Sequence, residues 1–245
     1  MFDLRYYMAG AYVAVALLTD CGGSQPPIGA PGAMLQSHAI AQTRSAADHV
    51  LPPWSYRVLY GFDNYFDNYV TGALPAAGLV AVNGMLYGTT SYGGQKCSCG
   101  TVYRISTAGK LKVLYQFAGG SDGAHPLAGL IDMNGTLYGT TLEGGGSPCY
   151  AGQGCGIIYS ITTAGVETVL HRFAGGSDGA TPVAGLINVN GTLYGTTVYG
   201  GSSDKGTVYS ITQSGVETIV HSFRGGGAGA RPFGGLIDVN GKLYG

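Results

Sequence analysis

The motif Asn-Gly-x-Leu-Tyr-Gly occurs four times in this chain, and its recurrence constrains the fold more than any other feature. Its tyrosines are Tyr87, Tyr138, Tyr194 and Tyr244, separated by 51, 56 and 50 residues. A period near 50 residues is typical of tandem-repeat proteins, in which each repeat is one supersecondary unit that needs its neighbours to bury its apolar face. The sequence therefore predicts a stack of similar units.

Each repeat unit contains four segments with the pattern of β-strands. In the second full unit they are residues 129–133, 136–141, 156–162 and 167–173. The Asn-Gly pair between the first two is a strong hairpin signal, because both central positions of a type I′ turn need a positive φ. Four antiparallel strands in about 50 residues are typical of a β-propeller blade. We therefore predict an all-β fold, a β-propeller-like array of four-stranded antiparallel blades that is incomplete in this chain.

The variation in repeat length is confined to one loop, between the second and third strands. The interval from the third-strand tyrosine of one unit to the second-strand tyrosine of the next is 35 residues from Tyr103 to Tyr138 and from Tyr159 to Tyr194. The interval between these tyrosines within a unit is 16, 21 or 15 residues. Alternating strand directions place the variable loop at the same end as the Asp-Gly-Ala-x-Pro connector to the next unit. We call this end the long-loop face and expect any binding site to lie there.

Changes in composition along the chain predict three regions. Residues 1–21 have the layout of a signal peptide, with a weakly charged start and a short apolar run. The run ends in a tetrad that resembles a bacterial lipidation site at Cys21, although Asp20 stands where a small residue is expected. A cleaved signal with no lipid on the cysteine is the alternative. Residues 22–53 are rich in Gly, Ser and Pro and are expected to form a flexible linker, and 54–245 form the repeat domain.

The repeat domain holds three full units and two partial ones. The full units lie at about 78–117, 129–173 and 185–223. Residues 54–62 resemble a lone fourth strand, and 235–245 resemble a first strand, its turn and the start of a second. Because propellers close with roughly four to eight blades, the partial units either complete a four-bladed ring or mark a fragment of a longer array. We expect the fragment.

Composition limits the partners that the chain can have. Charged residues make up 10% of its 245 residues and the formal net charge is −1. A basic patch for nucleic acid is therefore not expected. The apolar run near the N-terminus is too short to span a bilayer, so contact with a membrane is expected only through a lipid on Cys21. We expect a monomer with no cofactor, no metal site and no assignable catalytic residue.

The repeated text resembles a known family. Its elements are Gly-Leu-Ile-Asp-x-Asn-Gly-x-Leu-Tyr-Gly-Thr-Thr, then Gly-Gly, Gly-Thr-Val-Tyr-x-Ile and Glu-Thr-Val-Leu-x-x-Phe, over roughly residues 54–245. They are similar to the choice-of-anchor tandem-repeat GloVer family of bacterial envelope proteins. The resemblance implies a secreted protein attached to the envelope, with no assigned activity.

Five cysteines fit one lipidated residue and two pairs in an oxidising compartment. Cys149 and Cys155 flank the longest variable loop, where a disulfide would pin it. Cys97 and Cys99 are close enough in sequence that a bridge between them would be strained, so pairing between the first and second loops is an alternative. Free thiols, or a metal site of four thiolates, would also fit these cysteines.

Residues that differ between units on the long-loop face are the candidate ligand-binding positions, because a scaffold repeats what packing needs and varies what it presents. Neutral drift would produce the same variation. The positions before the connector proline and in the Gly-Gly loop give the set Tyr92, His125, Glu143, Thr181, Tyr199 and Arg231.

Three further groups of polar residues have simpler interpretations. Asp122 and Asp178 are expected to stabilise Asp-Gly turns, with a calcium loop as the alternative. His171 and His221 replace tyrosines of the remaining fourth strands and are expected to pack between units. The glutamates that begin two fourth strands, at positions 167 and 217, are expected to be solvated.

Two classes of function follow. The first is a secreted or envelope-anchored scaffold that presents its long-loop face to a glycan or a protein. The second is an extracellular polysaccharide hydrolase or lyase, for which His125 with Glu143 or Asp122 is the only visible acid–base pair. A structural surface repeat without a specific ligand is a third interpretation.

Overall fold

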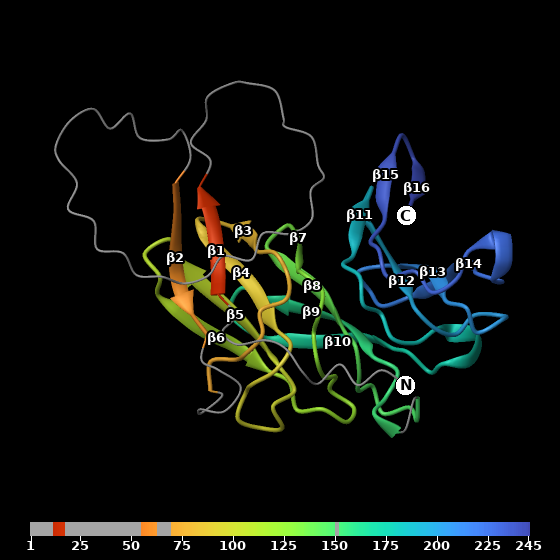
Figure 1. Cartoon of the computed structure of the whole chain (residues 1–245), viewed down its shortest axis with the longest axis horizontal. Coiled ribbons are helices and arrows are strands. Elements are labelled where there is room, and N and C mark those ends of the chain that lie inside the picture. Colours follow the sequence, from red (N-terminus) through yellow and green to blue (C-terminus); the bar gives the residue numbers. More distant parts are fainter. Residues whose placement is uncertain (1–11, 18–54, 63–69, 150–151) are drawn as a thin grey trace, which may run out of the picture. The chain divides into compact units, whose positions relative to one another are not determined.

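The computed structural model describes residues 12–17, 55–62, 70–149 and 152–245 (Figure 1). The chain divides into two compact units, one of Met1–Val13 with Leu59–Gly245 and the other of Ala14–Val58. The strands β1 (Tyr12–Leu17) and β2 (Ser55–Gly61) form a two-stranded sheet. Apart from these strands, the predicted signal peptide and linker lie outside the described residues, as does Cys21.

Each full repeat unit is a four-stranded antiparallel sheet whose strands follow in chain order (Figure 1). The first sheet contains β3 (Val80–Val82), β4 (Met85–Thr90), β5 (Thr101–Ser106) and β6 (Leu111–Gln116). The second contains β7 (Ile131–Met133), β8 (Thr136–Thr141), β9 (Ile157–Thr162) and β10 (Glu167–Arg172). The third contains β11 (Ile187–Val189), β12 (Thr192–Thr197), β13 (Thr207–Ile211) and β14 (Glu217–Ser222). The strands β15 (Ile237–Val239) and β16 (Lys242–Tyr244) form a hairpin. The prediction of four-stranded antiparallel units is confirmed.

The Asn-Gly pairs form the two-residue turns that the sequence predicts. In the second unit Met133 pairs with Thr136 across the turn. Asn134 has φ 55° and Gly135 has φ 83°, both in the left-handed region. These values suit a type I′ turn, whose twist matches that of the two strands. Local turn chemistry therefore fixes the register of β7 against β8.

A tyrosine on the third strand of each sheet fills its centre. Tyr159 lies opposite Gly139 of β8 and is fully buried. A Cβ atom on Gly139 would lie 2.6 Å from the Tyr159 hydroxyl oxygen, so only glycine leaves room for the ring. The Tyr159 ring also contacts Phe117 of the preceding unit, with 5.1 Å between ring centroids. Burying such a ring contributes about 1.5–3 kcal/mol.

The same aromatic contact joins each unit to the one before it. Tyr103 contacts Phe62 at 4.9 Å, and Tyr209 contacts Phe173 at 5.2 Å between centroids. These edge-to-face or tilted pairs add about 0.5–1.5 kcal/mol beyond burial. The regular spacing of the repeat therefore reflects one aromatic contact made again at each junction.

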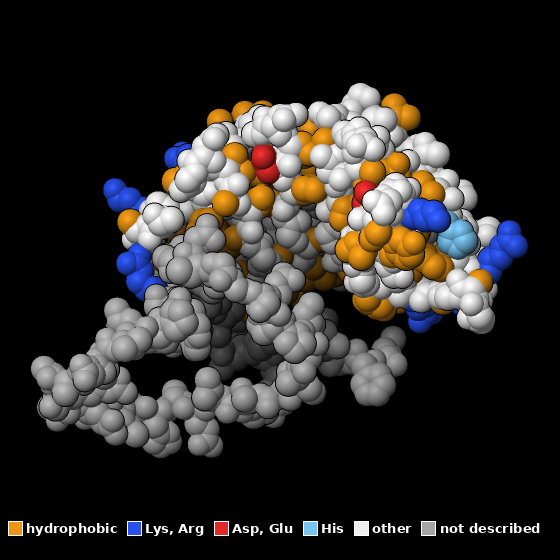
Figure 2. Space-filling view, turned by 90° about the horizontal axis from the view of Figure 1, so that it is seen from above, with side chains coloured by type: hydrophobic (Ala, Val, Ile, Leu, Met, Phe, Trp, Pro, Cys, Tyr) orange, Lys and Arg blue, Asp and Glu red, His pale blue; other side chains and the backbone are white. Residues whose placement is uncertain are grey.

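Charge is sparse on the surface as well as in the sequence. Figure 2 shows a face on which apolar and uncharged side chains predominate, with Lys, Arg, Asp and Glu scattered singly. In the part of the chain that the structure describes, no helix has the length and apolar character needed to cross a bilayer.

Candidate functional site

The connector and the variable loop of each unit are held together by backbone hydrogen bonds. In the second unit the Ala124 amide donates to the Glu143 carbonyl at 2.8 Å, and the Glu143 amide donates back at 3.0 Å. Equivalent bridges join Ala73 to Tyr92 and Ala180 to Tyr199. The structure therefore places both segments at one end of each unit, as the strand directions predict.

Glycines allow these two segments to meet at backbone distance. A Cβ atom on Gly144 of the loop would lie 2.4 Å from the Cα atom of Gly123 in the connector. Both glycines also have positive φ values, 85° and 104°. Side chains at either position would separate the two segments, which explains why the repeat retains Gly-Gly in the loop and a glycine before the connector alanine.

The second threonine of the Gly-Thr-Thr motif fixes the start of the variable loop. The hydroxyl of Thr141 donates to the Glu143 carbonyl at 2.8 Å, and Thr197 donates to the Tyr199 carbonyl at the same distance. Both threonines are fully buried at the end of a strand. These hydrogen bonds therefore hold the backbone of the candidate residues Glu143 and Tyr199 in place.

The residue before the connector proline has a left-handed backbone in all four occurrences. The φ angles are 55° for Leu74, 57° for His125, 63° for Thr181 and 52° for Arg231. Holding a non-glycine residue there costs of order 1–3 kcal/mol and usually occurs where the surroundings over-determine the backbone. In the second unit they do so, because the His125 amide donates to Cys99 O and its carbonyl accepts from Leu142 N.

His125 lies at the centre of a cluster of candidate residues. Its ring stacks obliquely on Tyr92 of the preceding unit, with 4.6 Å between centroids. Its Nδ1 lies 2.8 Å from the Ser91 carbonyl, and its Nε2 lies 3.7 Å from Glu143 Oε2. Both side chains remain partly accessible, at 20% for His125 and 24% for Glu143. Three of the six predicted residues thus form one accessible group.

Tyr199 and Arg231, two more candidate residues, meet at the junction that follows the third unit. The Arg231 guanidinium lies over the Tyr199 ring, 5.1 Å from its centroid, a separation at which a cation–π interaction is favourable. Thr181 has the same backbone position as His125 but belongs to neither group. The structure therefore brings five of the six residues into two groups.

A surface hollow of about 390 Å³ adjoins His125 and Glu143. Its wall also includes Gly146, Pro148 and Gln153 from the longest variable loop. The volume is within the range of small-molecule sites, about 300–1,000 Å³. A ligand group in this hollow would contact the imidazole and the carboxylate together.

Disulfides stiffen the two loops beside the hollow. The sulfurs of Cys97 and Cys99 are bonded, as are those of Cys149 and Cys155. This pairing is the local one, rather than pairing between the loops. Both bridges pack against a connector glycine, Gly119 in one case and the equivalent glycine of the next unit in the other. The repeated glycine thus leaves space for a disulfide, a role that the sequence pattern alone does not indicate.

The connector aspartates accept hydrogen bonds that stabilise their turns. Asp122 accepts the Ala118 amide at 2.7 Å and the Tyr115 hydroxyl at 2.6 Å. Asp178 accepts the Ala174 amide at 2.6 Å. These bonds support the turn interpretation. His125 pairs instead with Glu143, and no bond between His125 and Asp122 is present among the described residues.

Glu167 contradicts the expectation of a solvated strand end. It is only partly exposed, and its Oε1 is buried without a hydrogen-bond partner among the described residues. The pKa of Glu167 is raised to about 7, chiefly by burial and also by the nearby Asp122 carboxylate, against the opposing effects of the Tyr115 hydroxyl and the Arg172 guanidinium. A carboxyl at this position therefore holds its proton near neutral pH.

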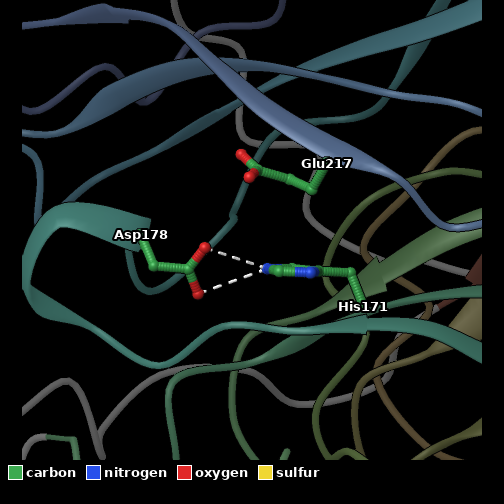
Figure 3. A group of neighbouring side chains, drawn as sticks. All are labelled: His171, Asp178 and Glu217. Atoms are coloured by element: carbon green, nitrogen blue, oxygen red, sulfur yellow. Dashed lines mark hydrogen bonds and ion pairs between the residues drawn. The ribbon is translucent and has the colours of Figure 1, made fainter.

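Glu217 is the equivalent residue of the third unit, and the same expectation is wrong for it. Its Oε1 is also buried without a partner among the described residues. Figure 3 shows that it lies beside His171 of β10 and Asp178 of the 3-10 turn η2 (Gly176–Asp178). Burial raises the pKa of Glu217; His171 opposes this shift and Asp178 adds to it. The sequence shows that Glu217 is equivalent to Glu167, since both begin a fourth strand, but it carries no signal that this position is buried.

His171 bonds to Asp178 as Tyr115 bonds to Asp122 in the preceding unit, with an imidazole in place of the phenol. Its Nε2 lies 3.1 and 3.2 Å from the two carboxylate oxygens of Asp178. Burial would raise the pKa of Asp178, but hydrogen bonds from His171 and the Ala174 amide, with the charge on His171, lower it on balance. The predicted packing between units is made mainly by Phe173, two residues later, against which the His171 ring packs at 5.0 Å.

The fold and the long-loop face define a class, the all-β tandem-repeat proteins built from four-stranded antiparallel units. Residues 53–245 match the family described as Gloeobacter/Verrucomicrobia repeat, and the chain belongs to this family. The resemblance seen in the repeated motif is thereby confirmed. A comparison with curated proteins gave no match.

Proposed function

We propose that this protein is an extracellular binding module whose repeat units are arranged as propeller blades and whose long-loop face binds a glycan. One observation carries the proposal. The connector position has a left-handed backbone in every unit, and glycine would relieve the strain, yet it holds Leu, His, Thr or Arg. A side chain kept where the backbone disfavours it is a candidate for function.

The chemistry beside this position suits a carbohydrate. Tyr92 and Tyr199 combine an apolar ring face with a hydroxyl, a combination that suits a partly apolar and partly hydrated partner. His125 and Glu143 supply a donor and acceptors for hydroxyl groups. The hollow beside them has room for a sugar ring. A sparsely charged surface, by contrast, offers little to a polyanion such as nucleic acid.

The disulfides support an extracellular location. Two bonded cysteine pairs fit an oxidising compartment, because thiols are kept reduced in the cytosol of most organisms. Anchoring to the bacterial envelope, through Cys21 or another device, is part of this proposal and follows the family resemblance.

Hydrolysis of a polysaccharide is the second candidate, and the proximity of His125 to Glu143 is the observation that favours it. Most glycosidases use two carboxyl groups about 5–10 Å apart. The second carboxylate considered, Asp122, is bonded to Tyr115 and the connector backbone. Binding is therefore the better supported function.

A glycan array tests the proposal directly. Wild-type protein is applied to immobilised bacterial and plant polysaccharides, beside the variants Tyr92→Ala and His125→Ala. Lys110→Ala is the matched control, since it removes an exposed side chain at the Thr-Ala-Gly turn of the opposite end. We expect binding that both long-loop variants weaken at least tenfold and the control retains.

Three results separate the two candidate functions. If no polysaccharide is bound, or if binding is unaffected by both long-loop variants, the proposal is wrong. Release of reducing ends by wild-type protein, lost in Glu143→Gln, would identify a hydrolase instead.

A further inference from the structure

A second cluster of polar side chains lies away from the hollow, at the junction of the second and third units. It consists of His171 of β10, Asp178 of η2 and Glu217 of β14, which converge from three separate segments (Figure 3). One ligand atom from each lies within 4.8 Å of the others, and all three residues are partly buried. The cluster plays no part in the proposed glycan site.

The donor set is mixed, with one imidazole nitrogen and two carboxylates. These are ligands that Zn²⁺ accepts, at about 2.0–2.2 Å, in tetrahedral sites whose ligand atoms are about 3.3 Å apart. His171 Nε2 and Asp178 Oδ1 are already 3.1 Å apart. A ligand atom of Glu217 lies within 4.8 Å of both, so its side chain must move inward to complete a face of the tetrahedron. Mg²⁺ and Ca²⁺ prefer oxygen ligands throughout.

The orphan oxygen of Glu217, which Glu167 shares at the preceding junction, leaves room for a partner at this cluster. Glu217 Oε1 is buried and has no hydrogen-bond partner among the described residues. A buried carboxylate oxygen without a partner is destabilising. In natural structures such an atom usually has a hydrogen-bond partner or a ligand. A cation between Glu217 and Asp178 would satisfy it and would also offset the repulsion between the two carboxylates.

The preceding junction provides a comparison within the same chain. There Tyr115, Asp122 and Glu167 occupy the equivalent positions, and the phenol replaces the imidazole. At the following junction His221 is present, but Ala228 replaces the aspartate. Only the middle junction therefore combines histidine with both carboxylates in the described chain.

We propose that His171, Asp178 and Glu217 form a Zn²⁺ site that links successive repeat units. The ion takes Nε2 of a neutral His171 and one oxygen from each carboxylate, with water in the remaining position. The proton that Nε2 now shares with Asp178 leaves to solvent on binding, so charge and atoms balance. Because the ligands come from two units and their connector, the bound ion stabilises their junction.

Isothermal titration calorimetry with Zn²⁺ tests the site in the full chain, after treatment with chelator and with the disulfides intact. The central variant is His171→Tyr, which recreates the Tyr–Asp hydrogen bond of the preceding junction and so should fold. We expect His171→Tyr to take up one equivalent fewer than wild type. Glu217→Gln should weaken binding at least tenfold. Tyr115→His should gain one equivalent.

His221→Tyr is the matched control, because it makes the same exchange at a junction that lacks the aspartate. It should leave the number of bound equivalents unchanged. Thermal melts provide a second readout, in which Zn²⁺ raises the melting temperature of wild type but not of His171→Tyr. The proposal is overturned if wild type and His171→Tyr bind the same number of equivalents, or if Tyr115→His gains none.

Discussion

The raised pKa of Glu167 makes a quantitative prediction for Glu167→Gln. A carboxyl whose pKa is higher in the folded protein contributes stability below its unfolded pKa, near 4.5, and this stability is lost as pH rises through about 7. Glutamine mimics the protonated form at every pH. The variant should therefore be closest to wild type at pH 5 and exceed it increasingly as the pH rises to 8.

The magnitude follows from the shift. The pKa of Glu167 rises from 4.5 to about 7 on folding, and this difference corresponds to roughly 3 kcal/mol at about 1.36 kcal/mol per pH unit. Glu167 remains partly exposed, so solvent screening reduces this to about 1–2 kcal/mol. We expect the free energy of unfolding of Glu167→Gln to exceed that of wild type by this amount at pH 8.

Urea unfolding at pH 5, 6, 7 and 8, followed by circular dichroism, measures the difference. The remaining carboxyl groups titrate in both proteins and cancel when the two curves are subtracted. The m-value should stay constant, so that the change reports stability alone. A difference that is the same at all four pH values would refute the assignment of a proton to Glu167.

Three further predictions follow from the junctions and cores. Tyr159→Phe removes a buried hydroxyl that has no partner among the described residues, so thermal melts should show equal or higher stability, by up to about 1–3 kcal/mol; a large loss would contradict this. Gly139→Ala places a Cβ atom 2.6 Å from the Tyr159 hydroxyl oxygen and should destabilise the protein by about 2 kcal/mol or more. An unchanged midpoint in urea unfolding would contradict this, because it would mean that the sheet adjusts to accommodate the methyl group. Thr181→Gly relieves a left-handed backbone in a β-branched residue and should be neutral or stabilising by up to about 1 kcal/mol in the same assay, whereas clear destabilisation would mean that Thr181 makes a packing contact.

The strands were predictable because their signals are local. The Asn-Gly turn at Asn134 fixes a register, and alternation in residues 157–161 identifies a strand. The end of the unit that carries the long loops followed from strand direction and interval length alone. Neither inference needs knowledge of which units touch.

The roles of single polar residues were harder to predict, because they depend on contacts between units. Glu167 begins an edge strand, a position typical of solvated side chains, yet its neighbours in space are Tyr115 and Asp122 of the preceding unit. The left-handed backbone of His125 likewise arises from bonds to Cys99 and Leu142 that no sequence pattern records. The sequence shows which residues vary between units, and the structure shows the backbone hydrogen bonds that fix their positions.

The most direct test of the central claim replaces the three charged or polar connector residues together. His125→Gly, Thr181→Gly and Arg231→Gly in one protein keep the left-handed backbone and remove the presented side chains. Calorimetric titration with the best polysaccharide from the array is compared with wild type, with thermal melts in parallel. The account predicts binding at least tenfold weaker at equal or higher melting temperature. Unchanged affinity would contradict it.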